Sequence, residues 1–348
     1  MPVRIGIIGL GWMGQLQAKY LQFVRDAELV AVCDVNEHRT ADVSKTYGVL
    51  GYTDYKGMLD NPDVDAVYIV VPQKLHYNII KDCIASNKHI LCEKPLGLTE
   101  EEIHGIRVMT KDYKKKFVVD FPERFTISCQ EAMKVIVDGH IGRIDYLRGN
   151  FRFSMKNHNK THGLWVFDRS QGGGLILESS VHMWDMVRHI TGSEVVSITA
   201  VAREDIVNGN KLEDNFVAIG YLENGSICCI DMSGSLPSNA ATDKRFEVIG
   251  SEGMVYIDEF QNFLTVHSEK PVENNPEMFA SGMTYKDLMW HSEIEGGVKR
   301  LQQHFIDTVL RDLPSSPGAE DGCRATEITW AIIKSLESQK MEIVKYGT

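Results

Sequence analysis

Short apolar runs alternate with helical stretches over the first 122 residues of the chain. Apolar runs bounded by turn residues predict buried strands, and their regular alternation with helices favours a parallel sheet covered on both faces. The predicted strands are residues 3–8, 29–33, 66–71, 89–92 and 117–119. The pattern therefore predicts an α/β domain of residues 1–122, built on a doubly wound parallel sheet.

The pattern changes after residue 122. A predicted helix at residues 128–138 precedes a set of segments in which apolar and polar residues alternate: 195–203, 215–222, 226–233, 244–249, 254–258 and 263–267. The turns at 223–225 and 251–253 each predict a hairpin. Helices at 297–310 and 322–339 close the chain. Residues 123–348 are therefore predicted to form an α+β domain with an open, mainly antiparallel sheet covered by helices on one face.

A glycine turn follows the first strand directly. Gly9, Gly11 and Gly14 form a GxGxxG pattern before a helical stretch, residues 15–24. In a dinucleotide-binding turn the first glycine permits the bend, the second lets the backbone approach a pyrophosphate, and the third lets the helix pack closely. Asp34 ends the second strand, 20 residues after Gly14, where a carboxylate meets the ribose hydroxyls. The spacing predicts a Rossmann domain.

The carboxylate of Asp34 favours NAD over NADP, since it accepts hydrogen bonds from both ribose hydroxyls and repels a 2′-phosphate. Arg39 would offset part of that repulsion, so NADP stays open as the cofactor.

Composition limits the partners. A chain of 348 residues is long for one core, and its net charge of −11 argues against nucleic acid. Seven cysteines without a CxxC pair suit reduced thiols. The chain starts directly in a strand and has no run of 18 apolar residues, so neither a secretion signal nor a membrane span is predicted. We expect a cytoplasmic protein that acts on a small molecule.

Glu93-Lys94-Pro95 follows the strand at residues 89–92. Ligands bind beyond the carboxyl ends of parallel strands, so Lys94 is expected at the same edge as the glycine turn. A single lysine after a strand is more often only a surface charge. Beside a positively charged nicotinamide, however, its charged form loses stability and it becomes suited to proton transfer.

A second group of titratable residues follows Gly174. On a helical period Glu178, His182, Asp185 and His189 form one stripe, while Met183, Met186, Val187 and Ile190 lie opposite. Such a stripe is often only the wet face of an amphipathic helix. Histidine, however, is the side chain best suited to proton transfer near neutral pH, which favours function for Glu178, His182 and Asp185. His189 is expected to be structural.

Two further histidines raise the question of a metal. His158 and His162 are four residues apart, but no cysteine or carboxylate stands beside them at ligand spacing, so no metal site is predicted. Trp165, Asp168 and Arg169, just before the glycines at 172–174, are either lid residues over a polar substrate or ordinary loop contacts.

Together these motifs resemble the Gfo/Idh/MocA oxidoreductase family over nearly the whole chain. The resemblance implies NAD(P)-dependent oxidation of a secondary alcohol of a sugar, sugar derivative or cyclitol such as inositol, or the reverse reduction. It implies cofactor contacts from Gly9, Gly11, Trp12, Met13, Gly14, Asp34, Val71, Pro72, His76, Glu93 and Lys94. Substrate contacts are implied for Lys94, Arg124, Trp165, Arg169, Glu178, His182 and Asp185.

The resemblance also implies catalytic roles. Lys94 would polarise the reacting oxygen and His182 would exchange its proton, with Glu178 beside them. The family commonly has Asp where this chain has Glu178. An NAD-assisted glycoside hydrolase and a non-catalytic NAD-binding regulator stay open as alternatives. The open face of the second sheet predicts a homodimer or homotetramer, because monomers rarely expose such an area.

Overall fold

The computed structural model describes residues 1–157, 164–167, 171–207, 210–260, 263–269, 283–286 and 293–347. These residues divide into two compact units. The first contains Met1–Phe121, residues 171–173 and Val298–Thr326; the second contains the described residues of 122–167 and 174–297 and the C-terminal segment from residue 327. The chain first crosses between the units at Phe121 and Pro122, one residue from the predicted boundary. The assignment of the domains as 1–122 and 123–348 stays a prediction.

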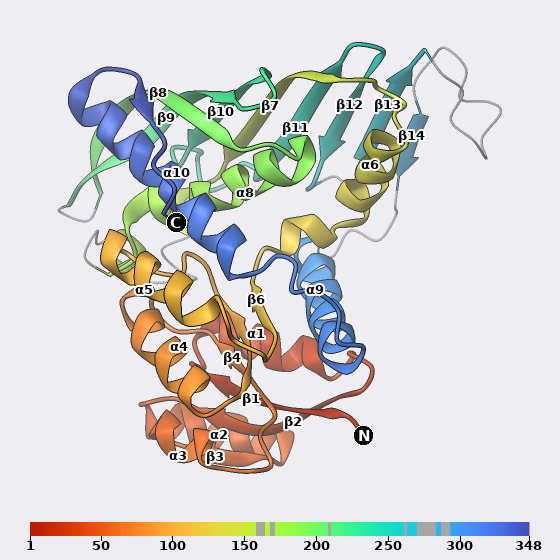
Figure 1. Cartoon of the computed structure of the whole chain (residues 1–348). Helices are drawn as coiled ribbons and strands as arrows, with labels where there is room; N and C mark the ends of the chain where they lie inside the picture. The colour runs from red at the N-terminus through yellow and green to blue at the C-terminus, as the bar shows by residue number, and fades with distance from the viewer. Residues whose placement is uncertain are drawn as a thin grey trace. The chain divides into compact units, whose positions relative to one another are not determined.

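The first unit is built on one parallel sheet of six strands (Figure 1). Its order is β3-β2-β1-β4-β5-β6, the Rossmann order, which confirms the predicted fold class. The strands are β1 (Val3–Ile8), β2 (Ala27–Cys33), β3 (Leu50–Tyr52), β4 (Ala66–Ile69), β5 (His89–Cys92) and β6 (Phe117–Val119). The helices between them are α1 (Trp12–Leu21), α2 (Glu37–Tyr47), α3 (Tyr55–Leu59), α4 (His76–Ala85) and α5 (Glu100–Thr110).

The segment Val298–Thr326 returns to the first unit and covers part of it. It contains most of α9 (Glu293–Leu310) and the start of α10 (Ala319–Ser338). The ring of Phe305 meets that of Tyr68 edge to face at 5.6 Å between centroids. The Gln302 side chain donates a hydrogen bond to the backbone carbonyl of Gln17, 3.0 Å away. Phe305 thus packs on β4 and Gln302 is bonded to α1, and the two contacts hold α9 against the first unit.

The second unit is a sheet of nine strands with helices on one face (Figure 1). Its order is β14-β13-β12-β11-β7-β10-β9-β8-β15, and every pair is antiparallel except β7 with β10. The predicted open, mainly antiparallel sheet is therefore confirmed, as are both hairpins. The strands are β7 (Ile144–Arg152), β8 (Val195–Val207), β9 (Asn210–Leu222), β10 (Ile227–Ser233), β11 (Asp243–Gly250), β12 (Gly253–Asp258), β13 (Phe263–Ser268), β14 (Met283–Lys286) and β15 (Glu342–Ile343).

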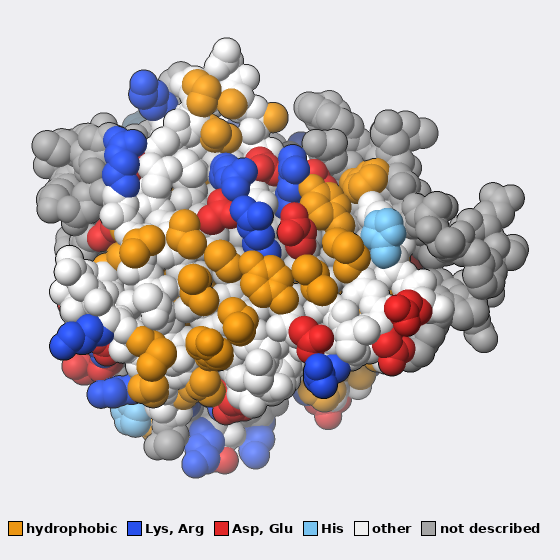
Figure 2. Space-filling model, turned by 90° about the horizontal axis from the view of Figure 1, so that it is seen from above, with side chains coloured by type: hydrophobic (Ala, Val, Ile, Leu, Met, Phe, Trp, Pro, Cys, Tyr) orange, Lys and Arg blue, Asp and Glu red, His pale blue; other side chains and the backbone are white. Residues whose placement is uncertain are grey.

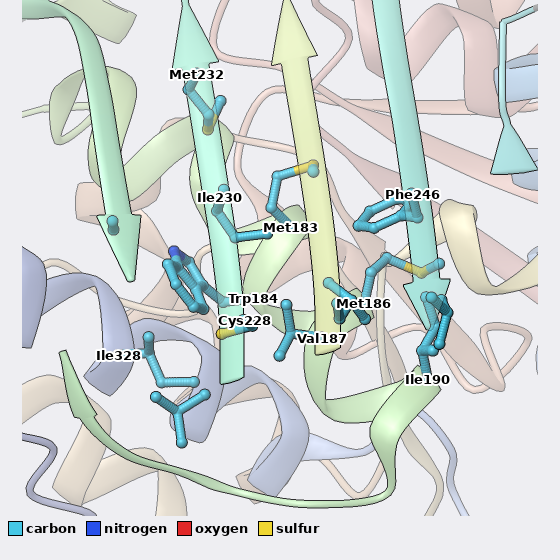
Figure 3. Packing of buried hydrophobic residues seen from close by; sticks show 14 of the residues in the cluster. Met183, Trp184, Met186, Val187, Ile190, Cys228, Ile230, Met232, Phe246 and Ile328 are labelled. Atoms are coloured by element: carbon cyan, nitrogen blue, oxygen red, sulfur yellow. The ribbon is translucent and has the colours of Figure 1, made fainter. Parts of the chain in front are cut away.

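The helices α6 (Ile127–Val137), α8 (Ser180–Thr191) and α10 contribute to the core of this unit. Figure 3 shows the apolar side of α8 against the sheet. The residues packed there are Met183, Trp184, Met186, Val187 and Ile190 of α8, Cys228, Ile230 and Met232 of β10, Phe246 of β11 and Ile328 of α10. Because these apolar side chains form one face of α8 and pack against the sheet, the opposite face of α8, which carries His182, points away from the sheet.

The opposite face of the second sheet carries side chains in contact with water. Figure 2 shows hydrophobic groups gathered on it around a band of charged ones. Val201, Val217, Ile219 and Tyr221 are 67%, 37%, 46% and 50% exposed. Arg148 and Arg152 of β7 both pair with Asp231 of β10. None of the helices among the described residues is long and apolar enough to cross a membrane.

Candidate active site

The glycine turn of the first unit has the geometry that its spacing predicts. Gly9 has φ of +93°, and a Cβ there would lie 2.0 Å from the Val70 carbonyl oxygen. A Cβ on Gly14 would lie 1.9 Å from the carbonyl oxygen of Gly9. Neither position accepts a side chain, because both distances are far below van der Waals contact.

Gly11 differs from the other two glycines. It is the N-cap of α1, no side chain caps this helix, and a Cβ on Gly11 would meet no protein atom within 4 Å. The space beside Gly11, at the N-terminus of α1, is therefore open, which suits the phosphates of a dinucleotide. Trp12 is 46% exposed and Met13 is half-buried beside this turn.

Asp34 connects the glycine turn with the turn that follows β2. One carboxylate oxygen accepts the N–H of Leu10 at 2.8 Å, and the other accepts the N–H of Asn36 at 2.9 Å. The guanidinium of Arg39 donates to the first oxygen at 3.1 Å. These bonds fix the carboxylate at the end of β2, the position predicted for the adenosine ribose.

His76 holds two turns of the same sheet edge together. Its Nδ1 lies 2.8 Å from the Pro95 carbonyl oxygen, and its Nε2 lies 2.9 Å from that of Val71. Complete burial lowers the pKa of His76 to about 4, although the two carbonyl oxygens act in the other direction. The ring is therefore neutral near pH 7, and since a neutral imidazole has one N–H, it donates to one of the two carbonyl oxygens and lies against the other.

Lys94 is 9% exposed and follows β5 at this edge. It lies between Glu93 and Pro95. The backbone N–H of Glu93 donates a hydrogen bond to the carbonyl oxygen of Ile69 at 3.0 Å. Val71, Pro72 and Glu93 are half-buried. The first unit thus brings the glycine turn, Asp34 and Lys94 to the carboxyl ends of its strands, as the sequence predicts.

In the second unit, His182 is bound to a carboxylate that the sequence did not single out. Its Nδ1 lies 2.9 Å from an oxygen of Glu123 in the short 3₁₀ helix η2 (Pro122–Phe125). The other oxygen of Glu123 accepts from the Lys244 ammonium at 2.6 Å. No local sequence pattern indicated that these two side chains pair, because Lys244 lies in a strand 121 residues from Glu123.

Arg124 and Asp185 form a buried ion pair. Two guanidinium nitrogens of Arg124 donate to the two oxygens of Asp185 at 2.7 Å and 2.5 Å. Their side chains are 7% and 0% exposed. Both were predicted to bind substrate, whereas the structure shows them joined to each other between η2 and α8.

Glu178 lies in a π-helical turn, η4 (Leu175–Ser179), between Gly174 and α8. The sequence predicted an uninterrupted helix there. Glu178 is 7% exposed, and its carboxylate accepts a hydrogen bond from the Ser179 hydroxyl. Such turns occur often at functional sites.

The remaining candidates are divided by what the structure describes. Trp165 is half-buried against the core of the second unit. Arg169, Asp168, His158 and His162 lie outside the described residues. Within the described ranges, no three histidine, cysteine or acidic side chains are placed to hold a metal ion.

Both halves of the chain match models of known protein families. Residues 3–121 match a model described as an oxidoreductase family with an NAD-binding Rossmann fold, and residues 129–256 match the GFO/IDH/MocA C-terminal domain. A myo-inositol 2-dehydrogenase of Thermotoga maritima is 27% identical over 97% of both chains. An NAD⁺-dependent scyllo-inositol 2-dehydrogenase of Bacillus subtilis is 31% identical over 73% of both.

Solved structures agree in fold over the full length. A levoglucosan dehydrogenase in complex with NADH and L-sorbose superposes with a TM-score of 0.86 at 25% identity, covering 100% of both chains. A probable dehydrogenase from Thermotoga maritima has a TM-score of 0.81 at 27% identity and covers 98% of each chain.

Proposed function

Since the chain belongs to the Gfo/Idh/MocA family of NAD-binding oxidoreductases, we propose that it transfers a hydride between NAD and a secondary alcohol of a sugar or cyclitol. The observation that carries the proposal is Lys94, a lysine only 9% exposed at the carboxyl edge of an NAD-binding sheet. A dehydrogenase needs a donor that polarises the reacting oxygen, and this edge is where ligands of such sheets bind.

The first unit supplies the fit for the dinucleotide. The open space beside Gly11 and the uncapped N-terminus of α1 suit the pyrophosphate, and the fixed carboxylate of Asp34 suits the ribose hydroxyls. When bound, the nicotinamide supplies the acceptor or donor of the hydride. The Asp34 carboxylate, which two backbone N–H groups hold in place, would repel a 2′-phosphate and supports NAD over NADP, although Arg39 offsets part of its charge. Trp12, Met13, Val71 and Pro72 would border the same ligand.

Two side chains would handle the substrate proton. In the oxidation direction Lys94 donates a hydrogen bond to the alcohol oxygen, and His182 accepts the hydroxyl proton as the carbonyl forms. Glu178, fixed by the Ser179 hydroxyl, would accept hydrogen bonds from neighbouring substrate hydroxyls. Arg124 and Asp185 would hold α8 against η2 and so keep His182 in place, in addition to the substrate contact implied for them. The proposal requires Lys94 and His182 to act on the same oxygen.

The relatives narrow the substrate class. Their names specify inositols and levoglucosan, all of them molecules with several secondary hydroxyls. A panel of inositols, monosaccharides, sugar acids and anhydrosugars, assayed by the absorbance of NADH, tests the proposal. Net NADH formation with at least one member is expected.

The alternatives have different outcomes in this assay. Cleavage of an aryl glycoside without net NADH would instead identify an NAD-assisted glycoside hydrolase. NADH binding without turnover of any substrate would favour a regulator.

We also propose that the chain forms a homodimer or homotetramer through the open face of the second sheet. The exposed Val217, Ile219 and Tyr221, beside the Arg–Asp pairs of β7 and β10, make a patch suited to burial against a second copy (Figure 2). Light scattering that gave a monomer mass would contradict this. A cytoplasmic location and the lack of a nucleic-acid partner remain expectations from composition.

A further inference from the structure

A network of three charged side chains, almost entirely shielded from water, stands behind His182. Glu123 of η2, Lys244 of β11 and Glu259, just after β12, have side chains that are 6%, 2% and 1% exposed. The Lys244 ammonium lies 2.6 Å from one oxygen of Glu123 and 3.2 Å from an oxygen of Glu259. It also lies 5.1 Å from the centre of the Phe151 ring. Burying three ionisable groups together costs free energy, because each loses its hydration, and the cost is offset only where the groups pair with one another.

The network keeps Glu123 ionised. Burial by itself raises the pKa of this carboxyl, but the charges of His182 and Lys244 and their hydrogen bonds hold the pKa well below its ordinary value. Burial lowers the pKa of Lys244, and the two carboxylates reverse this, so that its pKa is raised. Glu123 therefore has no proton to donate near pH 7.

An ionised Glu123 determines which nitrogen of His182 carries the proton. The contact between His182 Nδ1 and the Glu123 oxygen measures 2.9 Å. A carboxylate only accepts hydrogen bonds, so Nδ1 must be the donor. In the neutral ring Nε2 is then the basic nitrogen, and it is the atom that can take a proton from a substrate.

Other titratable groups around α8 do not compete for this role. Asp185 is joined to Arg124, and Glu178 accepts from Ser179. On the helices and strands packed against α8, burial raises the pKa of the Cys129 thiol well above its ordinary value and that of Cys228 to about 12, so both are neutral. Within this unit the imidazole thus contacts the Glu123 carboxylate directly, and Lys244 and Glu259 lie behind that carboxylate.

We propose that Glu123 is the positioning residue of His182, with Lys244 and Glu259 as its buried support, and that it fixes the Nδ1–H form and stabilises the imidazolium that forms during alcohol oxidation. This rests on the proposed function of His182. In that step the substrate O–H bond breaks, its proton passes to Nε2, and the hydride leaves the carbinol carbon for the cofactor. The imidazolium then faces an ionised carboxylate, as in the serine protease triad.

A purely structural role predicts something different. If the network only attached η2 to α8 and the sheet, its loss would lower stability without shifting the titration of His182. The two charges also predict opposite shifts. Glu123→Gln removes the anion and lowers the pKa of His182, whereas Lys244→Met removes a cation and raises it.

The first test observes His182 directly and needs no turnover. The chain is labelled with ¹⁵N-histidine, and the ring signals of His182 are assigned by comparison with His182→Gln. We expect the Nδ1–H form in the wild type and opposite pKa shifts in the two single variants. An Nε2–H form in the wild type, or unchanged titration in both variants, would overturn the proposal. If either single variant fails to fold, Glu123→Ala/Lys244→Met, which removes both charges and the acceptor of Nδ1–H together, must still lose the fixed Nδ1–H form.

The second test is kinetic. Glu123→Gln should lower kcat by at least about tenfold to a hundredfold, the effect of losing a carboxylate that orients a metal-bound histidine. Because the anion beside the imidazole is lost, it should also move the histidine limb of the pH profile to lower pH, with the affinity for NADH unchanged. The matched control is Glu131→Gln on α6, where the same change affects a half-exposed partner of Lys134, and it should behave as wild type.

The two tests separate two kinds of failure. If no sugar or cyclitol is oxidised, the proposed function fails, while the tautomer measurement still decides the role of Glu123. If turnover is normal in Glu123→Gln, the positioning role fails and the proposed function stands.

Discussion

The cofactor side of the candidate site and its proton-transfer side differ in how their parts are distributed along the chain. In the first unit Gly9, Gly11, Gly14 and Asp34 lie within one βαβ segment, and although Gly9 also packs against Val70, most of the contacts that require them are made inside that segment. In the second unit Glu123, the partner of His182, is 59 residues from it in sequence, and Lys244, the other partner of Glu123, is 121 residues from Glu123. Motifs whose contacts lie close together in the chain can be predicted from sequence, whereas the partners of a side chain such as His182 come from any element that packs nearby.

The largest effects are expected from the two groups proposed to act on the substrate oxygen. Lys94→Ala and His182→Ala should each lower kcat by about a hundredfold or more, because each removes a partner in proton transfer. The affinity for NADH, measured by fluorescence, should stay near that of wild type. Near-normal turnover in either variant would remove that residue from the mechanism.

The three glycines sharpen the comparison within the cofactor side. Gly14→Ala forces a Cβ to 1.9 Å from the Gly9 carbonyl oxygen and should lower the free energy of unfolding by about 1–3 kcal/mol or more. Gly11→Ala meets no protein atom and should cost less than about 1 kcal/mol, while weakening NADH binding about tenfold. Urea unfolding measures the loss of stability, and titration with NADH measures the change in affinity. Equal loss of stability in the two variants would contradict this assignment of the turn.

Asp34 tests the cofactor preference. Asp34→Asn keeps the shape of the side chain and removes its charge, so the preference for NADH over NADPH should fall by about tenfold, the value of one charged hydrogen bond. The ratio of the dissociation constants for NADPH and NADH, measured for wild type and variant, gives this preference. A wild-type preference for NADPH would show that Arg39 dominates instead.

His76 tests how pH acts on the cofactor side. Its pKa falls from 6.5 to about 4 on burial, so the unfolded chain binds the proton more tightly between these values. Its contribution to stability is complete above about pH 6.5 and is lost as the pH falls towards 4, by up to about 3 kcal/mol. Urea unfolding against pH should show a flatter acid limb for His76→Gln than for wild type. Parallel limbs would show that His76 is not the group responsible.

Most strands were predictable because their residues are buried in the pattern typical of their sheet. β1, β5 and β6 have the predicted bounds, and the alternation in the second half gave most of the sheet. β3 was missed because Leu50 and Gly51 are exposed in a strand of three residues. The parallel pairing of β7 with β10 was also missed, since local patterns do not specify strand order.

The candidate site was predictable to the extent that its residues stand at the ends of strands or on one helix. Lys94 and His182 were singled out in this way, and their roles stay predictions. Glu123 and Lys244 had no such signal, because burial of a charged side chain becomes visible only when its partner is known. The π-helical turn at Glu178 was missed as well, since Leu-Ile-Leu-Glu-Ser has no residue that interrupts a helix.

The most direct test of the central claim is a crystal structure with NADH and the sugar or cyclitol that proves active. The account predicts that Lys94 Nζ and His182 Nε2 both lie about 2.6–3.2 Å from one and the same substrate oxygen. A complex in which these two atoms contact different oxygens, or in which either is turned away from the ligand, would contradict it.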